Sequence, residues 1–96
     1  MQSRRWSAPS ARTLVYEIVW DDEVIEKLWR KHHVESWEVE EVVFDDEFAE
    51  FRWARDPAYG ERLLVRGETH SNRSLFVALD PIRQRGIYLC RIAFDK

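Results

Sequence analysis

The residues of this sequence best suited to chemistry lie around His32, which stands between Lys31 and His33. Histidine takes up and releases a proton near neutral pH, and lysine carries a compact positive charge. Neighbouring side chains on a helix point about 100° apart, so His32 and His33 cannot easily share one metal ion. We therefore expect no metal and no other cofactor at this position.

Arg62 and Arg66 form a second group. They are four positions apart in an apolar run with strand composition, so both should project from one face of that strand. Guanidinium groups at that spacing could bind adjacent phosphates. They could equally pair with Glu61, with Glu68 or with the acidic residues of the helices described next.

A short helix should position His32. Asp21 or Asp22 can cap its first turn, so the helix should begin at about Asp22. Its apolar stripe consists of Val24, Ile25, Leu28 and Trp29. Because His32 lies one turn further along that stripe, its role could instead be structural, either in packing or in capping the helix end.

A second helix should follow after a tight turn, with Ser36 as its cap and an end near Phe44 or Asp45. Its inward stripe consists of Val39, Val42 and Val43. We interpret the run Glu38, Glu40 and Glu41 as a solvated helix face. Neither helix is long enough to be stable alone in water, so both must pack against other elements.

The period of the sequence then changes to that of β-strands. Four apolar runs separated by turn residues cover residues 48–55, 61–70, 74–80 and 87–94. A fifth apolar run at 14–20 adds an edge strand or an extended arm. The pattern predicts an α+β fold, in which two short N-terminal helices pack on a four- or five-stranded antiparallel sheet.

Length and composition indicate one domain. We expect residues 14–96 to form it, and residues 1–13 to be a flexible segment without the apolar core of a signal peptide. Cys90 is the single cysteine, so we expect no intramolecular disulfide and take the cytoplasm as the default location. A buried apolar role suits Cys90 better than a nucleophilic one.

Charge is distributed unevenly along the chain. Residues 21–50 include 12 acidic and 3 basic side chains, whereas residues 51–96 include 5 acidic and 9 basic ones. This asymmetry would let a polyanion approach the sheet, or a basic partner approach the helices. Both surfaces could also be simply solvated.

Two groups of short motifs are spread along the chain. The first group comprises Trp20, Asp21, Lys31, His32, Val34, Val43, Phe44, Asp45 and Asp46, and the second comprises Arg62, Gly67, Thr69, Arg73 and Leu75. Together they resemble the BrnT-type toxins, a bacterial family with a RelE-like fold, over about residues 20–94. His33 stands where that family more often has glycine, a helix-ending position that favours a left-handed backbone.

The resemblance implies a metal-independent ribonuclease toxin of a type II toxin–antitoxin pair, neutralised by a cognate antitoxin protein. Cleavage by the 2′-hydroxyl of RNA requires acid and base groups, and cations that stabilise the charged phosphorane. The candidates are His32, Arg62 and Arg73 for catalysis and Lys31, Arg66, His70 and Arg91 for RNA binding. The acid and base roles stay unassigned, and Arg73 is most simply a solvated turn residue.

Two departures from the family pattern weaken the case for catalysis. The family follows a small residue and alanine with arginine and a further helix, whereas the last residues here are Ile92, Ala93, Phe94, Asp95 and Lys96. Glu68 stands where a basic residue is common, and its carboxylate would repel a phosphate. A noncatalytic protein-interaction module on the same scaffold is therefore the alternative function, and a homo-oligomer is left open.

Overall fold

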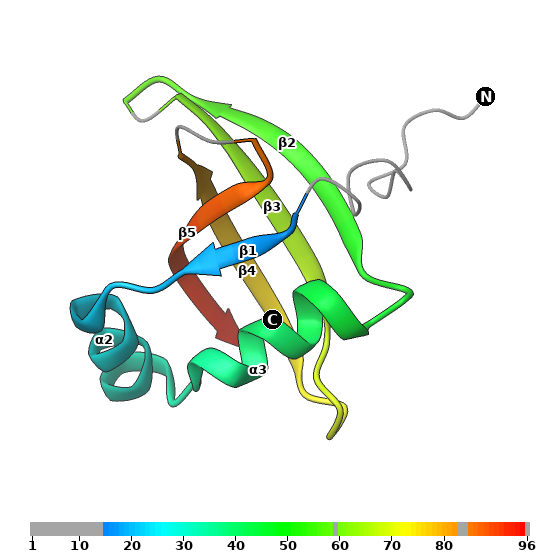
Figure 1. The fold of residues 1–96 in the computed structure, drawn as a ribbon. Helices are drawn as coiled ribbons and strands as arrows, with labels where there is room; N and C mark the ends of the chain where they lie inside the picture. The colour runs from blue at the N-terminus through cyan, green and yellow to red at the C-terminus, as the bar shows by residue number, and fades with distance from the viewer. Residues whose placement is uncertain (1–14, 59, 83–84, 96) are drawn as a thin grey trace.

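The computed structural model describes residues 15–58, 60–82 and 85–95. Its elements, in chain order, are β1 (Glu17–Val19), α2 (Asp22–His32), α3 (Ser36–Glu40), the π-helical segment η1 (Glu41–Asp45), β2 (Glu50–Asp56), β3 (Gly60–Glu68), β4 (Ser74–Pro81) and β5 (Ile87–Asp95). α3 runs directly into η1, so the two form one continuous helix (Figure 1). The α+β class is confirmed. The segment predicted to be flexible, 1–13, lies outside the described residues.

The five strands form one mixed sheet in the order β1-β5-β4-β3-β2. The four predicted strands are all present, with ends that differ from the prediction by at most two residues, and they pair antiparallel. The fully antiparallel sheet was a wrong prediction, because β1 pairs parallel with β5 and Ile18 lies opposite Tyr88. The direction of that pairing depends on a strand far along the chain, so the local sequence of β1 does not encode it.

The helix termini agree with the prediction at the first helix and differ at the second. Asp21 caps α2, where its Oδ1 accepts a hydrogen bond from the backbone N–H of Glu23 at 2.8 Å. The predicted cap Ser36 is instead the first helical residue, and Glu35 is the cap. Glu35 can take this position because Glu38 Oε1 accepts from the backbone N–H of Glu35 at 3.0 Å, satisfying an amide that has no partner within the helix.

The inner face of the sheet carries the buried strand residues Phe51, Leu63, Val65, Val77 and Leu79. The predicted inward stripe Val39, Val42 and Val43 belongs to the same hydrophobic cluster, so that prediction is confirmed. Gly67 allows the second helix to lie close to β3, because a Cβ there would lie 2.7 Å from Asp46 Oδ2 and 3.1 Å from Val42 Cγ1. η1 can therefore pack closely against β3 only where β3 lacks a side chain.

The first helix buries less than its apolar stripe predicts. Leu28 is buried, but Trp29 is 49% exposed and its ring contacts His33 edge-on, with the ring centroids 4.9 Å apart. His33 has a left-handed backbone with φ of 56°, which agrees with the helix-ending role expected for it. Among the described helices, none is long and apolar enough to span a bilayer.

The outer face of the sheet carries Arg62, Leu64 and Arg66 on β3, Phe76, Ala78 and Asp80 on β4, and Ile92 and Phe94 on β5. Pairing between β4 and β5 shifts at one point, from Ala78 opposite Ile92 to Leu79 opposite Cys90. Arg91 is the residue left over by this bulge. The irregularity lets both Cys90 and Ala93 face the core, and it places Arg91 beside the outer face.

The acidic run of the second helix is not the solvated face that we predicted. Glu38 is buried and accepts from Arg73 Nη1 at 2.9 Å. Glu40 accepts from the indole N–H of Trp20 at 3.0 Å, and Glu41 accepts from the backbone N–H of His70 at 2.9 Å. The prediction was wrong because these carboxylates serve as acceptors for donors far away in the sequence.

Candidate functional site

A groove of about 420 Å³ lies where α2 meets the outer face of the sheet. We call it the basic groove, and its lining consists of Val24, Lys27, Leu28, Lys31, His32, Arg62, Arg91 and Ile92. α2 contributes five of these residues because positions separated by three or four residues share one helix face. The lining therefore combines lysine, arginine and histidine side chains with aliphatic ones.

Asp80 holds the two arginines of the basic groove in place. Its Oδ1 accepts from Arg62 Nε at 2.8 Å, and its Oδ2 accepts from Arg91 Nε at 3.0 Å. The side chains of Arg62 and Asp80 are only 17% and 18% exposed, so this pair is poorly screened by water, whereas Arg91 is 46% exposed. The two planar guanidinium groups consequently have fixed orientations at the sheet side of the groove.

Cys90, the residue before Arg91 on β5, is buried in the core, as expected. Burial, together with the negative charge of Asp80, raises the pKa of the Cys90 thiol to about 12. A thiol with so high a pKa is almost entirely protonated near neutral pH, so it is a poor nucleophile. The structure therefore agrees with the apolar role predicted for Cys90.

His32 is the last residue of α2 and lies at the helix end of the basic groove. Its ring packs against Phe94, with the ring centroids 5.8 Å apart, and its backbone carbonyl accepts from Arg73 Nη2 at 3.0 Å. His32 thus combines the packing contact that we considered with a place on the groove wall.

Arg73 lies outside the basic groove, although the resemblance implies a catalytic role for it. Its guanidinium group donates to Glu38, to Asp95 and to the backbone carbonyls of His32 and His33, at 2.6–3.0 Å. The hydrogen bond with Asp95, followed by that with Glu38, raises the pKa of Arg73, although burial acts in the opposite direction. The side chain is only 25% exposed, so it is not the solvated turn residue we described.

Arg66 and His70, two predicted RNA-binding residues, are also outside the groove lining. Arg66 Nε donates to Glu50 Oε1 at 2.8 Å, on the neighbouring strand β2. The ring of His70 lies 3.1 Å from Glu41 Oε2 and 2.9 Å from Asp45 Oδ2. Arg62 and Arg66 do share one face, as predicted, and each pairs with an acid of a neighbouring strand, Arg62 with Asp80 and Arg66 with Glu50.

The groove brings together four of the seven predicted site residues, His32, Arg62, Lys31 and Arg91. It also includes Lys27, which the helical spacing from Lys31 could have indicated. Asp80 was missed because its importance arises from the pairing of β3, β4 and β5, which no local pattern reveals. In the described part of the chain, no three histidine, cysteine or acidic side chains are placed to hold a metal ion.

No protein family and no curated protein matches this sequence. The roles of the residues that carry the resemblance are therefore indicated by the contacts that these residues make. Asp46 Oδ2 accepts from the backbone N–H of Glu68 at 2.8 Å, Thr69 is buried and hydrogen-bonded to the backbone N–H of Arg73, and Val34 is fully buried. Most of the motif residues thus hold the scaffold together, while His32, Lys31 and Arg62 line the groove.

Proposed function

We propose that the protein is a metal-independent endoribonuclease of the toxin class in a type II toxin–antitoxin system, and that it acts in the cytoplasm. The observation that carries the proposal is the basic groove, in which His32, Lys31, Arg62 and Arg91 converge. A groove lined by both cationic and apolar side chains suits a polyanion that also presents apolar bases. The BrnT-type resemblance, with its RelE-like fold, supports the same class.

The chemistry assigned to this groove follows from its side chains. The 2′-hydroxyl of RNA loses its proton to a base and attacks the adjacent phosphorus, the bond from phosphorus to the 5′-oxygen breaks as that oxygen takes up a proton from an acid, and a 2′,3′-cyclic phosphate forms. His32 is the group of the groove whose side-chain type exchanges a proton near neutral pH. Arg62, held by Asp80, stabilises the charge that develops on the phosphorane. Lys31 and Arg91 bind the flanking phosphates.

A purified-protein assay on short RNA tests the proposal. His32→Ala should lower cleavage by about 10²–10⁴-fold, the usual contribution of an acid–base group, and Arg62→Gln by about 10²–10³-fold. The matched controls are His33→Asn, which suits a left-handed backbone, and Arg55→Gln, whose side chain is 75% exposed and pairs with Glu61. Both controls should cleave like wild type, as should wild type in EDTA.

The product identifies the reaction. A terminal 2′,3′-cyclic phosphate is expected, and RNA with a 2′-deoxy substitution at the cleaved nucleotide should survive. If the folded wild-type protein neither cleaves RNA nor slows bacterial growth on overexpression, the ribonuclease proposal is refuted.

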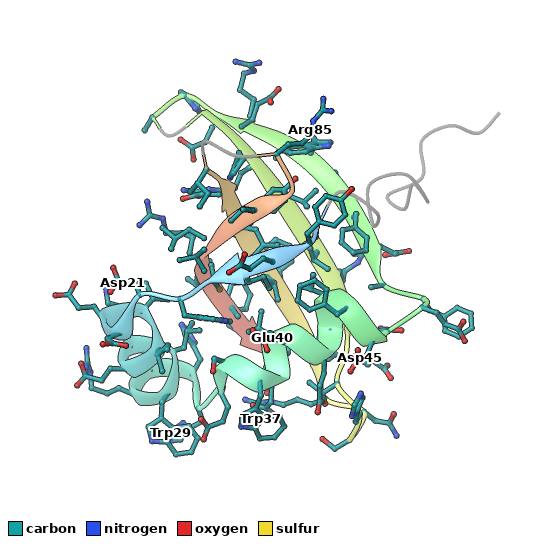
Figure 2. The ribbon with its side chains drawn as sticks, viewed as in Figure 1. Asp21, Trp29, Trp37, Glu40, Asp45 and Arg85 are labelled. Atoms are coloured by element: carbon teal, nitrogen blue, oxygen red, sulfur yellow. The ribbon has the colours of Figure 1, made fainter. Side chains whose placement is uncertain are left out.

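A second candidate function is a noncatalytic protein-interaction module, favoured by the helical surface. Trp29 and Trp37 are 49% and 56% exposed, and Figure 2 shows both indoles projecting from the helices toward the same side, away from the sheet. Partly exposed indoles on an acidic surface suit a basic partner protein, such as an antitoxin. Trp37→Ser should then weaken binding of a protein encoded next to this one, whereas Tyr16→Ser should not. Equal binding by both variants would count against the surface.

A further inference from the structure

Three aromatic rings from three different elements form a row that begins in the basic groove. His32 lines the groove, its ring centroid lies 5.8 Å from that of Phe94, and Phe94 lies 5.3 Å from Phe76. We call these three residues the aromatic row. All three are partly exposed, although each belongs to a residue type that could be buried completely in a core of this size.

The strand register continues the row across the sheet. Phe94 lies opposite Phe76, and Phe76 lies opposite Arg66, so the two phenyl rings stand between the groove and a further arginine. Ile92, two residues before Phe94, faces the same way and lines the groove. A path over the outer face therefore leads from the cations of the groove over two phenyl rings to Arg66.

Charged side chains and phenyl rings alternate along this path, as phosphates and bases alternate along a nucleic-acid strand. Asp80 lies between Arg62 and Arg91, and Glu50 pairs with Arg66, so these two carboxylates are matched by guanidinium groups, while the exposed Glu68, two residues after Arg66 on the same face of β3, is the acidic end of the path. The phenyl rings themselves carry no charge. A ligand that presents both anionic groups and flat apolar faces fits this alternation better than a ligand that is only anionic.

We propose that the aromatic row stacks unpaired bases, so that the ligand of the outer face is single-stranded RNA and not duplex RNA. The proposal rests on the proposed ribonuclease function and specifies its substrate class. Bases in a duplex already stack on each other, and their faces are inaccessible, whereas a single strand can lay successive bases on Phe94 and Phe76. Lys31 and Arg91 bind the phosphates on one side of these bases, and Arg66 binds those on the other.

Fluorescence anisotropy with a labelled, unstructured eight-nucleotide RNA tests this assignment. The RNA is 2′-O-methylated so that it cannot be cleaved, and the same strand annealed to its complement provides the duplex. Wild type should bind the single strand more tightly than the duplex. Phe94→Leu and Phe76→Leu should each weaken single-strand binding by about 5–150-fold, the range measured when a stacking side chain is removed, without changing duplex binding.

Matched variants separate stacking from loss of structure. Leucine retains most of the apolar volume but lacks the π-face, and Phe94→Tyr should bind like wild type because its ring is retained. Tyr16→Leu removes an aromatic side chain that is 73% exposed and lies outside the row, and it should bind normally. Circular dichroism checks each fold, and Phe94→Ile, with its higher strand propensity, replaces Phe94→Leu if that variant unfolds.

The outcomes distinguish the row from the groove. If Lys31→Ala weakens RNA binding but the phenylalanine variants bind like wild type, the aromatic row is refuted while the basic groove stands. Equal affinity of wild type for single strand and duplex also refutes the row. If the folded wild type binds neither RNA, both the row and the proposed ribonuclease function fail.

Discussion

Replacing Arg73 with methionine should remove a large part of the stability of the protein while leaving the cations of the basic groove unchanged. Arg73 donates to two carboxylates and two backbone carbonyls. The partner that matters most is Glu38, whose side chain is 10% exposed, because the partner Asp95 is 61% exposed and screened by water. Methionine retains most of the aliphatic length but leaves the carboxylate of Glu38 buried without its counter-ion.

The expected cost is about 3–5 kcal/mol, the range for breaking a buried ion pair by removing one partner. A small domain has about 5–15 kcal/mol of stability in total, so this change is a substantial fraction. Urea unfolding followed by tryptophan fluorescence measures it. With a slope of about 1–1.5 kcal/mol per molar urea, the midpoint should fall by about 2–5 M.

Arg55→Met is the matched control for Arg73→Met. Arg55 pairs with Glu61 at 3.3 Å, but the two side chains are 75% and 57% exposed, so its loss should cost less than about 1 kcal/mol. Adding Glu38→Gln to Arg73→Met should recover part of the loss, because the buried charge is then removed. Equal midpoint shifts for Arg73→Met and Arg55→Met would refute the reasoning, as would an absence of any recovery.

Three further changes test other parts of the structure. Gly67→Ala should cost about 1–3 kcal/mol in thermal unfolding, because the new Cβ would lie 2.7 Å from Asp46 Oδ2, and an unchanged melting temperature would contradict the close approach of η1 to β3. His33→Gly should stabilise the protein by about 0.5–1 kcal/mol by relieving the left-handed backbone, and a lower melting temperature would show that the ring contact with Trp29 outweighs this strain. The raised pKa of Cys90, about 12 against an ordinary value of 9.0, means that the unfolded chain loses the thiol proton first as the pH rises. Stability should therefore be intact below about pH 9 and decline from there toward pH 12, with Tyr88, whose pKa burial also raises, acting in the same direction. Urea unfolding between pH 8 and 11 should show a shallower decline for Cys90→Ala, and identical pH profiles would refute the assignment.

Local features of the sequence predicted the elements well, because the signals act over a few residues. Asp21 caps α2 with a side chain two positions from the amide that it accepts from, and Val39, Val42 and Val43 face the core through helical periodicity alone. The turns between the four antiparallel strands were similarly visible. By contrast, the exposure of Trp29 depends on what lies opposite the helix, so its apolar character was misleading.

The parts of the candidate site that could not be predicted depend on contacts between distant segments. The bulge at Arg91 exists only in the pairing of β4 with β5, and every residue from Ile92 to Phe94 is apolar, so alternation did not reveal which of them face inward. Asp80 joins Arg62 and Arg91 from a third strand. The role of Arg73 required knowing that a hairpin turn lies against the junction of the two helices.

The parallel pairing of β1 with β5 has a kinetic consequence. Glu17 pairs with Ile87, which is 70 positions later, and β1 leads directly into α2, whose groove is completed by residues of β5. Contacts between such distant segments form slowly, because a large loop must close before they can stabilise the fold. During synthesis, α2 therefore cannot form its contacts with β5 until β5 has left the ribosome. The RNA-binding surface that we propose would then mature only after β5 has been synthesised, so a nascent chain would be inert until its β5 is in place.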